Sequence, residues 1–157
     1  MKIILLQTGK TTEKYIGEGV SNYSGRLQKY TSFEIITLPD LKNTSNMPVK
    51  EQKEREGARM VQYLQKDDYV IVLDENGLEY STVEFAGRLE KMLMLQKKRI
   101  VFIIGGAYGF SGEVLERADL RLSLSRMTFS HQVVRLLFAE QLYRAFTVIR
   151  GEPYHHD

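Results

Sequence analysis

The feature that most constrains this chain is the regular alternation of short apolar runs with longer helical patterns. The runs are rich in Ile, Val and Leu, as strands buried on both faces are. They cover residues 2–8, 33–38, 68–73, 99–104 and 120–124. Helical spacing of apolar residues fills the stretches 11–30, 50–65, 81–99, 111–118 and 132–149. This alternation predicts an α/β fold with a mostly parallel sheet covered by helices.

The composition is that of an ordinary globular protein, and residues 1–157 are expected to form a single domain. The sequence contains no cysteine, which excludes disulfides and thiolate metal sites. The first residues carry no secretory signal, so we expect a cytoplasmic protein. The net charge of +2 indicates nothing about nucleic acid. A modest excess of Lys and Arg after Lys97 is most simply a solvated surface.

The last helical stretch, 132–149, has apolar residues on nearly every face. Such a helix must be covered on more than one side, and a second copy of the protein is the expected second cover. A membrane span is excluded because Arg135, Glu140 and Arg144 interrupt the stretch. Glu140 and Arg144 lie four residues apart and are predicted to form a helical ion pair.

Ligands of parallel α/β sheets bind beyond the carboxyl ends of the strands, which here are followed by the loops after Leu73, Ile104 and Leu124. The residues Asp74–Gly77 are read as a sharp turn. The Gly105-Gly106 pair is neither a dinucleotide fingerprint nor a P-loop. It either lets a ligand approach bare backbone or forms a plain tight turn.

The third strand end offers hydroxyl groups on Ser123, Ser125 and Thr128, a pattern that means little alone. His131 and Arg135 follow at a spacing of four, which would place them on one helix face. A histidine at a helix start is more simply a capping or packed residue than a catalytic one.

The C-terminal segment, Pro153 to Asp157, contains two adjacent histidines and an acid. These residues could hold a metal, be the remnant of a tag, or be frayed. They could also fold back over a site, where Tyr154 and an imidazole would face a nucleobase.

Four segments in order, 102–111, 124–131, 134–146 and 153–155, closely resemble the RlmH family of SPOUT-class methyltransferases. These enzymes methylate N3 of a pseudouridine in helix 69 of bacterial 23S ribosomal RNA. The resemblance spans the whole chain, from the opening Lys-Ile strand to the Tyr-His ending. Each motif alone is weak, and the four in order at this length are specific.

This resemblance implies a deep C-terminal trefoil knot, which general topology rules would have excluded. It also implies a homodimer that acts on 23S ribosomal RNA. The cofactor would be S-adenosylmethionine, held in the knot largely by main-chain groups, with no metal needed. The cofactor-binding residues would be Leu73, Gly105, Ser123, Leu124, Ser125, Arg126, Met127 and Thr128.

The catalytic candidates are His155, Glu140, Arg135 and Tyr154. His155 or Glu140 could remove the N3 proton, and Tyr154 could stack on a flipped-out base. Arg135 and Arg144 could hold RNA phosphate or structure the knot. Family members often have Pro where this chain has Ser130, a change expected to loosen the loop.

Two rival functions remain open on the sequence. One is a non-catalytic α/β module that binds a nucleotide or RNA. The other is a metal-dependent enzyme that uses His155, His156 and Asp157. With little net charge and no separate RNA-binding domain, an assembled ribosome is a better target than free RNA.

Overall fold

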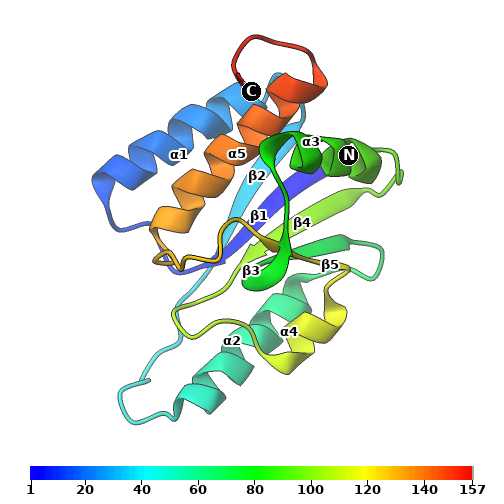
Figure 1. The fold of residues 1–157 in the computed structure, drawn as a ribbon. Coiled ribbons are helices and arrows are strands. Elements are labelled where there is room, and N and C mark those ends of the chain that lie inside the picture. Colours follow the sequence, from blue (N-terminus) through cyan, green and yellow to red (C-terminus); the bar gives the residue numbers. More distant parts are fainter. Residues whose placement is uncertain (157) are drawn as a thin grey trace.

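The computed structural model describes residues 1–156, and its elements alternate in the expected order (Figure 1). The strands are β1 (Lys2–Thr8), β2 (Ser32–Leu38), β3 (Tyr69–Glu79), β4 (Arg99–Ile104) and β5 (Leu120–Ser123). The helices are α1 (Lys14–Leu27), α2 (Val49–Tyr63), α3 (Thr82–Leu93), α4 (Gly112–Arg117) and α5 (Val133–Ile149).

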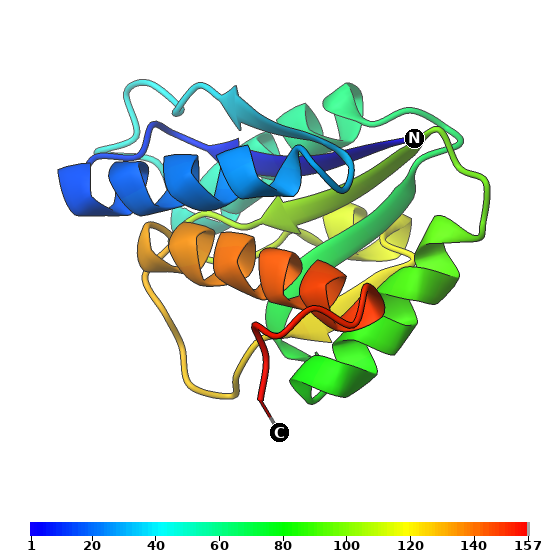
Figure 2. The same cartoon turned by 90° about the horizontal axis from the view of Figure 1, so that it is seen from above.

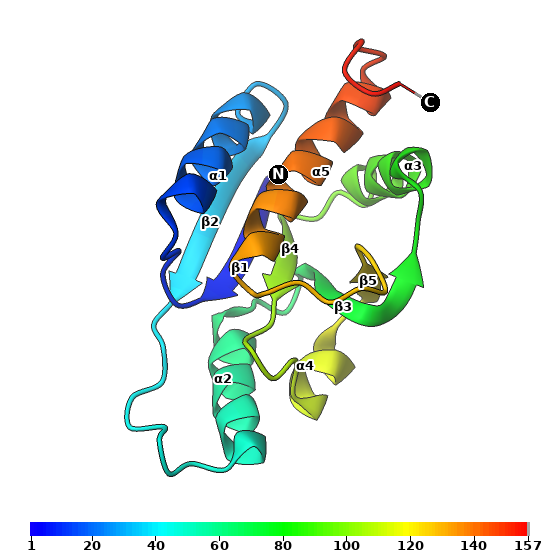
Figure 3. The same ribbon diagram turned by 60° about the vertical axis from the view of Figure 1, so that its left-hand side comes forward.

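The sheet is fully parallel, with strand order β2-β1-β4-β3-β5. Helices α1, α3 and α5 cover one face, and α2 and α4 cover the other (Figure 3). A hydrophobic core lies on each face of the sheet, and the side chains of β1 alternate between them. Ile3 and Leu5 lie in one core, and Ile4 and Leu6 lie in the other. The predicted α/β class is therefore confirmed.

Helix α5 lies between α1 and α3 on one face of the sheet (Figure 2). Phe138, Leu142 and Phe146 are buried against this surround. Gly19 of α1 lets the two helices approach, since a Cβ there would lie 2.6 Å from Leu136 Cδ1. The sheet and the two flanking helices cover much of α5, and Val133, Leu136 and Leu137 stay partly exposed, so the expected cover by a second copy stays a prediction.

Strand β3 continues beyond the turn expected at Asp74–Gly77. It bulges there and pairs with β5 a second time, Leu78 opposite Leu122. A Cβ at Gly77 would lie 2.6 Å from the carbonyl carbon of Arg121, so only glycine allows this close approach. The expected turn is therefore a bulge that clamps β3 onto the end of β5.

The segment 124–132 returns from β5 at the sheet edge to α5 in the middle of the helical layer. In Figure 1 the connection from β3 to α3 crosses in front of this segment, with the sheet behind it. The C-terminal part of the chain is thus threaded beneath an earlier connection. This is the knotted arrangement that the resemblance implies.

The helix boundaries differ most from the sequence pattern in α3 and α1. Helix α3 begins at the predicted capping box of Ser81 and Glu84, and it ends at Leu93 rather than at residues 97–99. Gln96 adopts a left-handed conformation (φ 55°) that ends the helical path. Helix α1 begins at Lys14 because residues 8–12 are bound to the start of α5 instead. Of the described helices, none is long and apolar enough to span a bilayer.

Candidate functional site

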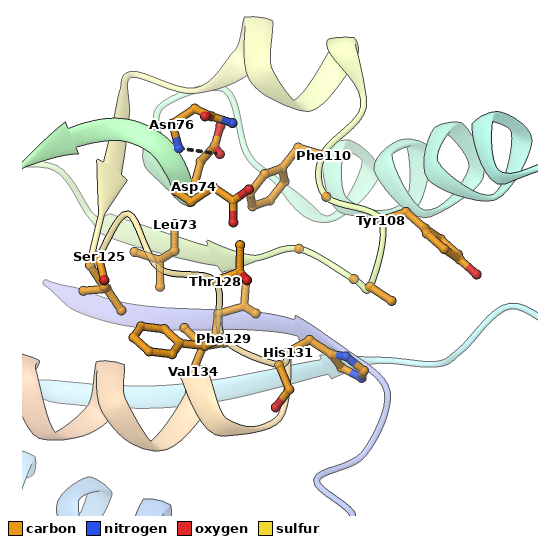
Figure 4. A pocket seen from close by; sticks show the side chains of 18 of the residues that line it. Leu73, Asp74, Asn76, Tyr108, Phe110, Ser125, Thr128, Phe129, His131 and Val134 are labelled. Carbon is orange, nitrogen blue, oxygen red and sulfur yellow. Dashed lines mark hydrogen bonds between the residues drawn. The ribbon is translucent and has the colours of Figure 1, made fainter.

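A cavity of about 850 Å³ opens at the carboxyl ends of β3, β4 and β5. Figure 4 shows Asp74 and Phe110 on one wall and Thr128, Phe129 and His131 on the other. The volume falls in the range of pockets that hold a cofactor-sized molecule. The site lies where the topology of parallel sheets predicts ligands.

The glycine loop after β4 forms one side of this cavity through main-chain atoms. Gly109 adopts a left-handed conformation (φ 83°), and its N–H donates to the carbonyl of Gly106 at 3.1 Å. A Cβ on Gly106 would collide with the Glu56 carboxylate. The segment is therefore a tight turn, and its glycines leave main-chain atoms exposed to the cavity.

Serine side chains hold the opposite loop in shape. Ser123 Oγ donates to the carbonyl of Ser125 at 2.9 Å, and Ser125 Oγ accepts from Met127 N–H at 3.0 Å. Ser130 Oγ accepts from Val133 N–H at 3.1 Å, which satisfies a free amide at the start of α5. The hydroxyl at the family's proline position thus restrains the loop, which offsets the predicted loosening.

The ionisable groups of the cavity are distributed unevenly. Asp74 and Glu75 line it from the β3 bulge, while Lys53 and His131 line it from α2 and the α5 loop. Asp74 Oδ1 accepts from the N–H of Asn76 at 3.1 Å, so its carboxylate is fixed in place. A cationic ligand such as a sulfonium would be attracted to this acidic bulge.

Glu56 lies behind the glycine loop and is half-buried. Burial raises the pKa of this carboxyl, the nearby Asp40 raises it further, and Arg59 opposes the shift. The carboxylate contacts the Cα side of Gly106, where a larger residue would not fit. Glu56 therefore supports the backbone of the cavity from outside.

Arg135 is buried, with 1% of its surface exposed, and does not line the cavity. Its guanidinium donates to the Thr8 carbonyl at 2.9 Å and to Thr11 Oγ1 at 3.0 Å, and its Nε donates to the His131 carbonyl at 3.0 Å. Burial lowers the pKa of Arg135 and the charge of Asp40 opposes this shift.

These contacts bear on two sequence predictions. The expectation that His131 and Arg135 share a helix face is wrong, because α5 begins only at Val133 and the two side chains diverge. Of the two roles considered for Arg135, its contacts support structuring the knot. A phosphate could not reach the buried guanidinium in this arrangement.

The other catalytic candidates form one cluster at the far part of α5. Arg144 Nε and Nη2 both donate to Glu140 Oε1, at 3.0 and 2.5 Å, which confirms the predicted ion pair. This hydrogen bond is the main reason that the pKa of Arg144 is raised. Tyr154 OH donates to the same carboxylate oxygen at 3.2 Å, and Arg144 Nη1 lies 3.2 Å from His155 Nδ1.

This cluster is separate from the cavity of the same chain. Arg144 lies ten residues beyond Val134, the last residue of α5 on the cavity wall, which is about 15 Å along a helix. None of Glu140, Arg144, Tyr154 and His155 lines the cavity. The C-terminal segment folds back, but it lies over α5 and not over the cavity of its own chain, where one sequence alternative had placed it.

The cofactor-binding predictions divide into two groups. Most of them line the cavity, namely Leu73, Gly105, Leu124, Ser125, Met127 and Thr128. Ser123 is buried behind it and borders a smaller cavity of about 330 Å³ beneath the β3–α3 connection. Arg126 points away and pairs with Glu79 at 3.3 Å.

Sequence reasoning missed several lining residues, among them Asp74, Tyr108, Phe110 and Phe129. Asp74 directly follows a strand end, so the rule that placed the site there could have identified it. The aromatic residues carry no such signal. Within residues 1–156 no group of three metal-binding side chains is found, and Asp157 of the metal alternative lies outside this range.

Comparison with known proteins gives consistent results. Residues 1–155 match the family model described as "Predicted SPOUT methyltransferase". A "Ribosomal RNA large subunit methyltransferase H" of Christiangramia forsetii is 49% identical over 156 residues, which are 99% of each chain. The protein of the same name from Parabacteroides distasonis is 46% identical over the full length of both chains.

A solved structure shares the fold. The tRNA (m1G37) methyltransferase from Aquifex aeolicus superposes with a TM-score of 0.55 and 18% identity, over 100% of this chain and 75% of that chain. At this identity the likeness concerns the fold alone. The knotted α/β architecture is therefore found in a second methyltransferase.

Proposed function

The chain belongs to the ribosomal RNA large subunit methyltransferase H family of SPOUT methyltransferases, and we propose that it transfers a methyl group from S-adenosylmethionine to large-subunit ribosomal RNA. The acceptor is N3 of a pseudouridine in helix 69 of 23S RNA. Family membership favours this enzyme over a non-catalytic binding module. We further propose a cytoplasmic location, where ribosomes are.

The observation that carries this proposal is the cavity at the strand ends, bordered by the glycine loop and by the loop 124–131. S-adenosylmethionine supplies an electrophilic methyl group when bound. In this proposal, main-chain groups near Leu73, Gly105 and Thr128, which line the cavity, hold the cofactor. The acidic side chain of Asp74 suits its sulfonium charge.

The reaction is an in-line displacement, in which the N3–C bond forms as the C–S bond breaks. The protein contributes chiefly by aligning the two reactants and excluding water. The N3 proton must pass to a base within hydrogen-bond reach, and His155 or Glu140 fills that role in our proposal. Arg144 already contacts both side chains and can orient them.

The base is identified by single-turnover methylation with His155→Ala and Glu140→Gln. Removing the base is expected to lower the rate about 100-fold or more and to flatten its dependence on pH. Cofactor affinity should not change, because in this proposal both side chains face the acceptor base and not the cofactor. A residue whose replacement leaves the wild-type rate is excluded as the base.

The substrate form is tested by methylation of free 23S RNA, isolated large subunits and intact ribosomes. We expect methyl incorporation into assembled ribosomes and little into free RNA. With a net charge of only +2, the chain has little non-specific attraction for RNA. Absence of incorporation into all three substrates would overturn the proposed function.

We also propose that the active form is a homodimer. The C-terminal cluster lies too far along α5 to serve its own cavity, so a second copy would supply Tyr154 and His155 to it. Sedimentation equilibrium is expected to give twice the 18.2 kDa of one chain. A monomer that is fully active would exclude this arrangement.

A further inference from the structure

A row of aromatic rings joins α1 to α5 outside the cavity. The ring centroids of Tyr23 and Tyr143 are 5.8 Å apart, and those of Tyr143 and Tyr30 are 6.1 Å apart. Tyr30 also stacks on Phe146 at 5.4 Å, with an angle of 7° between the planes. These rings are fixed by packing and form a rigid base for whatever lies above them.

Two exposed arginines lie over this row. The Arg26 guanidinium is 5.4 Å from the ring centroid of Tyr143 and 5.7 Å from that of Tyr23. The Arg150 guanidinium is 6.0 Å from the centroid of Tyr30. An aromatic ring that contacts the flat face of a guanidinium restricts its motion. The N–H groups at the edge of the guanidinium point away from the ring and stay accessible to solvent.

The charges of this surface are not balanced. Within the described chain, no carboxylate lies within 4 Å of a guanidinium nitrogen of Arg26 or Arg150. Glu152, two residues from Arg150 in the sequence, already has partners, since Tyr30 OH donates to its carboxylate at 2.6 Å and Lys29 Nζ lies 3.6 Å from it. Arg26 Nε donates to Asn22 Oδ1 at 3.3 Å, a neutral partner that leaves the charge in place. Two pre-oriented cations therefore have no acidic partner on a chain whose overall charge is close to neutral.

We propose that this surface, defined by Arg26, Arg150, Tyr23, Tyr30 and Tyr143, binds phosphates of folded ribosomal RNA beside the methylation target. Guanidinium groups with free edges are suited to phosphate oxygens. The inference rests on the proposed function and adds to it the docking surface for the substrate. Tyr154 OH lies 3.4 Å from Tyr23 OH, which connects this surface to the catalytic cluster.

The test is the double variant Arg26→Gln/Arg150→Gln, studied by equilibrium binding to ribosomes and by steady-state methylation. We expect the ribosome Kd and KM to rise about tenfold or more, with kcat within about twofold. The slope of log affinity against log salt should fall by about two, one for each lost phosphate contact. S-adenosylmethionine affinity by calorimetry should stay unchanged.

The matched control is Lys66→Gln/Lys98→Gln, which removes two exposed charges from the amino-terminal edge of the sheet. It is expected to keep the wild-type Kd and salt slope. An Arg26/Arg150 variant with wild-type ribosome affinity would refute the surface, and so would a fall in kcat with an unchanged KM. Loss of the dimer mass on sedimentation would assign the arginines to contacts between copies and also refute it. Inactive wild-type protein would instead count against the proposed function.

Discussion

Arg135 shows how one residue can join segments that are distant in sequence. Its three hydrogen bonds tie the end of β1 and the loop before α1 to the last residues of the knotted loop. Gln132 adds two more, from Thr12 N–H at 2.9 Å and to the Lys10 carbonyl at 3.0 Å. The sequence left a catalytic, a phosphate-binding and a structural role open for this arginine, and its burial favours the structural role.

Replacing Arg135 with Ala is expected to lower the free energy of unfolding by more than about 2 kcal/mol, because the buried Thr8 carbonyl and the partly buried His131 carbonyl lose their donor and a cavity remains. Arg135→Lys keeps the charge and loses the fork of donors, so it should lose less. Urea unfolding measures both. Equal stability of Arg135→Ala and the wild type would contradict the structural role.

Glu56→Gln is expected to raise the thermal midpoint near neutral pH. The folded protein raises the pKa of Glu56 above its ordinary value of 4.5, first through burial. The carboxyl therefore favours folding while protonated, below about pH 4.5, and this contribution is lost as pH rises through the raised pKa. Melting curves near pH 4 and pH 7 test this, and a gain of equal size at both would contradict it.

At the scale of elements, the sequence predicted well wherever local pattern decides the structure. Strands 2–8 and 99–104 were predicted to the residue, and the Ser81–Glu84 capping box opens α3 as expected. The errors occur where tertiary contacts override that pattern. The Asp74–Gly77 turn became a bulge because β5 pairs across it, and no local signal encodes that partner.

The close approach of β3 and β5 at the bulge can be tested by replacing Gly77. Gly77→Ala should destabilise the fold by about 2 kcal/mol or more, since the new Cβ would press on the backbone of Arg121. Gly87→Ala in α3 is the matched control, where nothing lies within 4 Å of the new Cβ. There we expect stabilisation of up to about 1 kcal/mol from helix propensity. Unfolding in denaturant measures both, and a neutral Gly77→Ala would be the contrary result.

At the scale of the whole molecule, family membership supplied what pattern could not. The alternation of elements predicts a parallel sheet, but a knot is among the last topologies that it would favour. Likewise, the strand-end rule located the cavity and missed its aromatic wall, because Tyr108, Phe110 and Phe129 carry no positional signal. The extent of the single domain over residues 1–157 stays a prediction.

In the proposed homodimer, one copy contributes the cavity and the other contributes the C-terminal cluster. Two defective variants separate these contributions. Gly105→Val adds a side chain against Phe110 and should block the cavity. A chain that ends at Glu152 lacks Tyr154 and His155 and leaves the cavity intact.

The deciding measurement is methyl transfer to ribosomes by these two variants, alone and after they are unfolded and refolded together. Each alone should be inactive. The mixture should recover about a quarter of the wild-type rate, since half of the dimers are mixed and each of those has one intact site. Full activity of the shortened chain alone, or an inactive mixture in which mixed dimers have formed, would contradict the account.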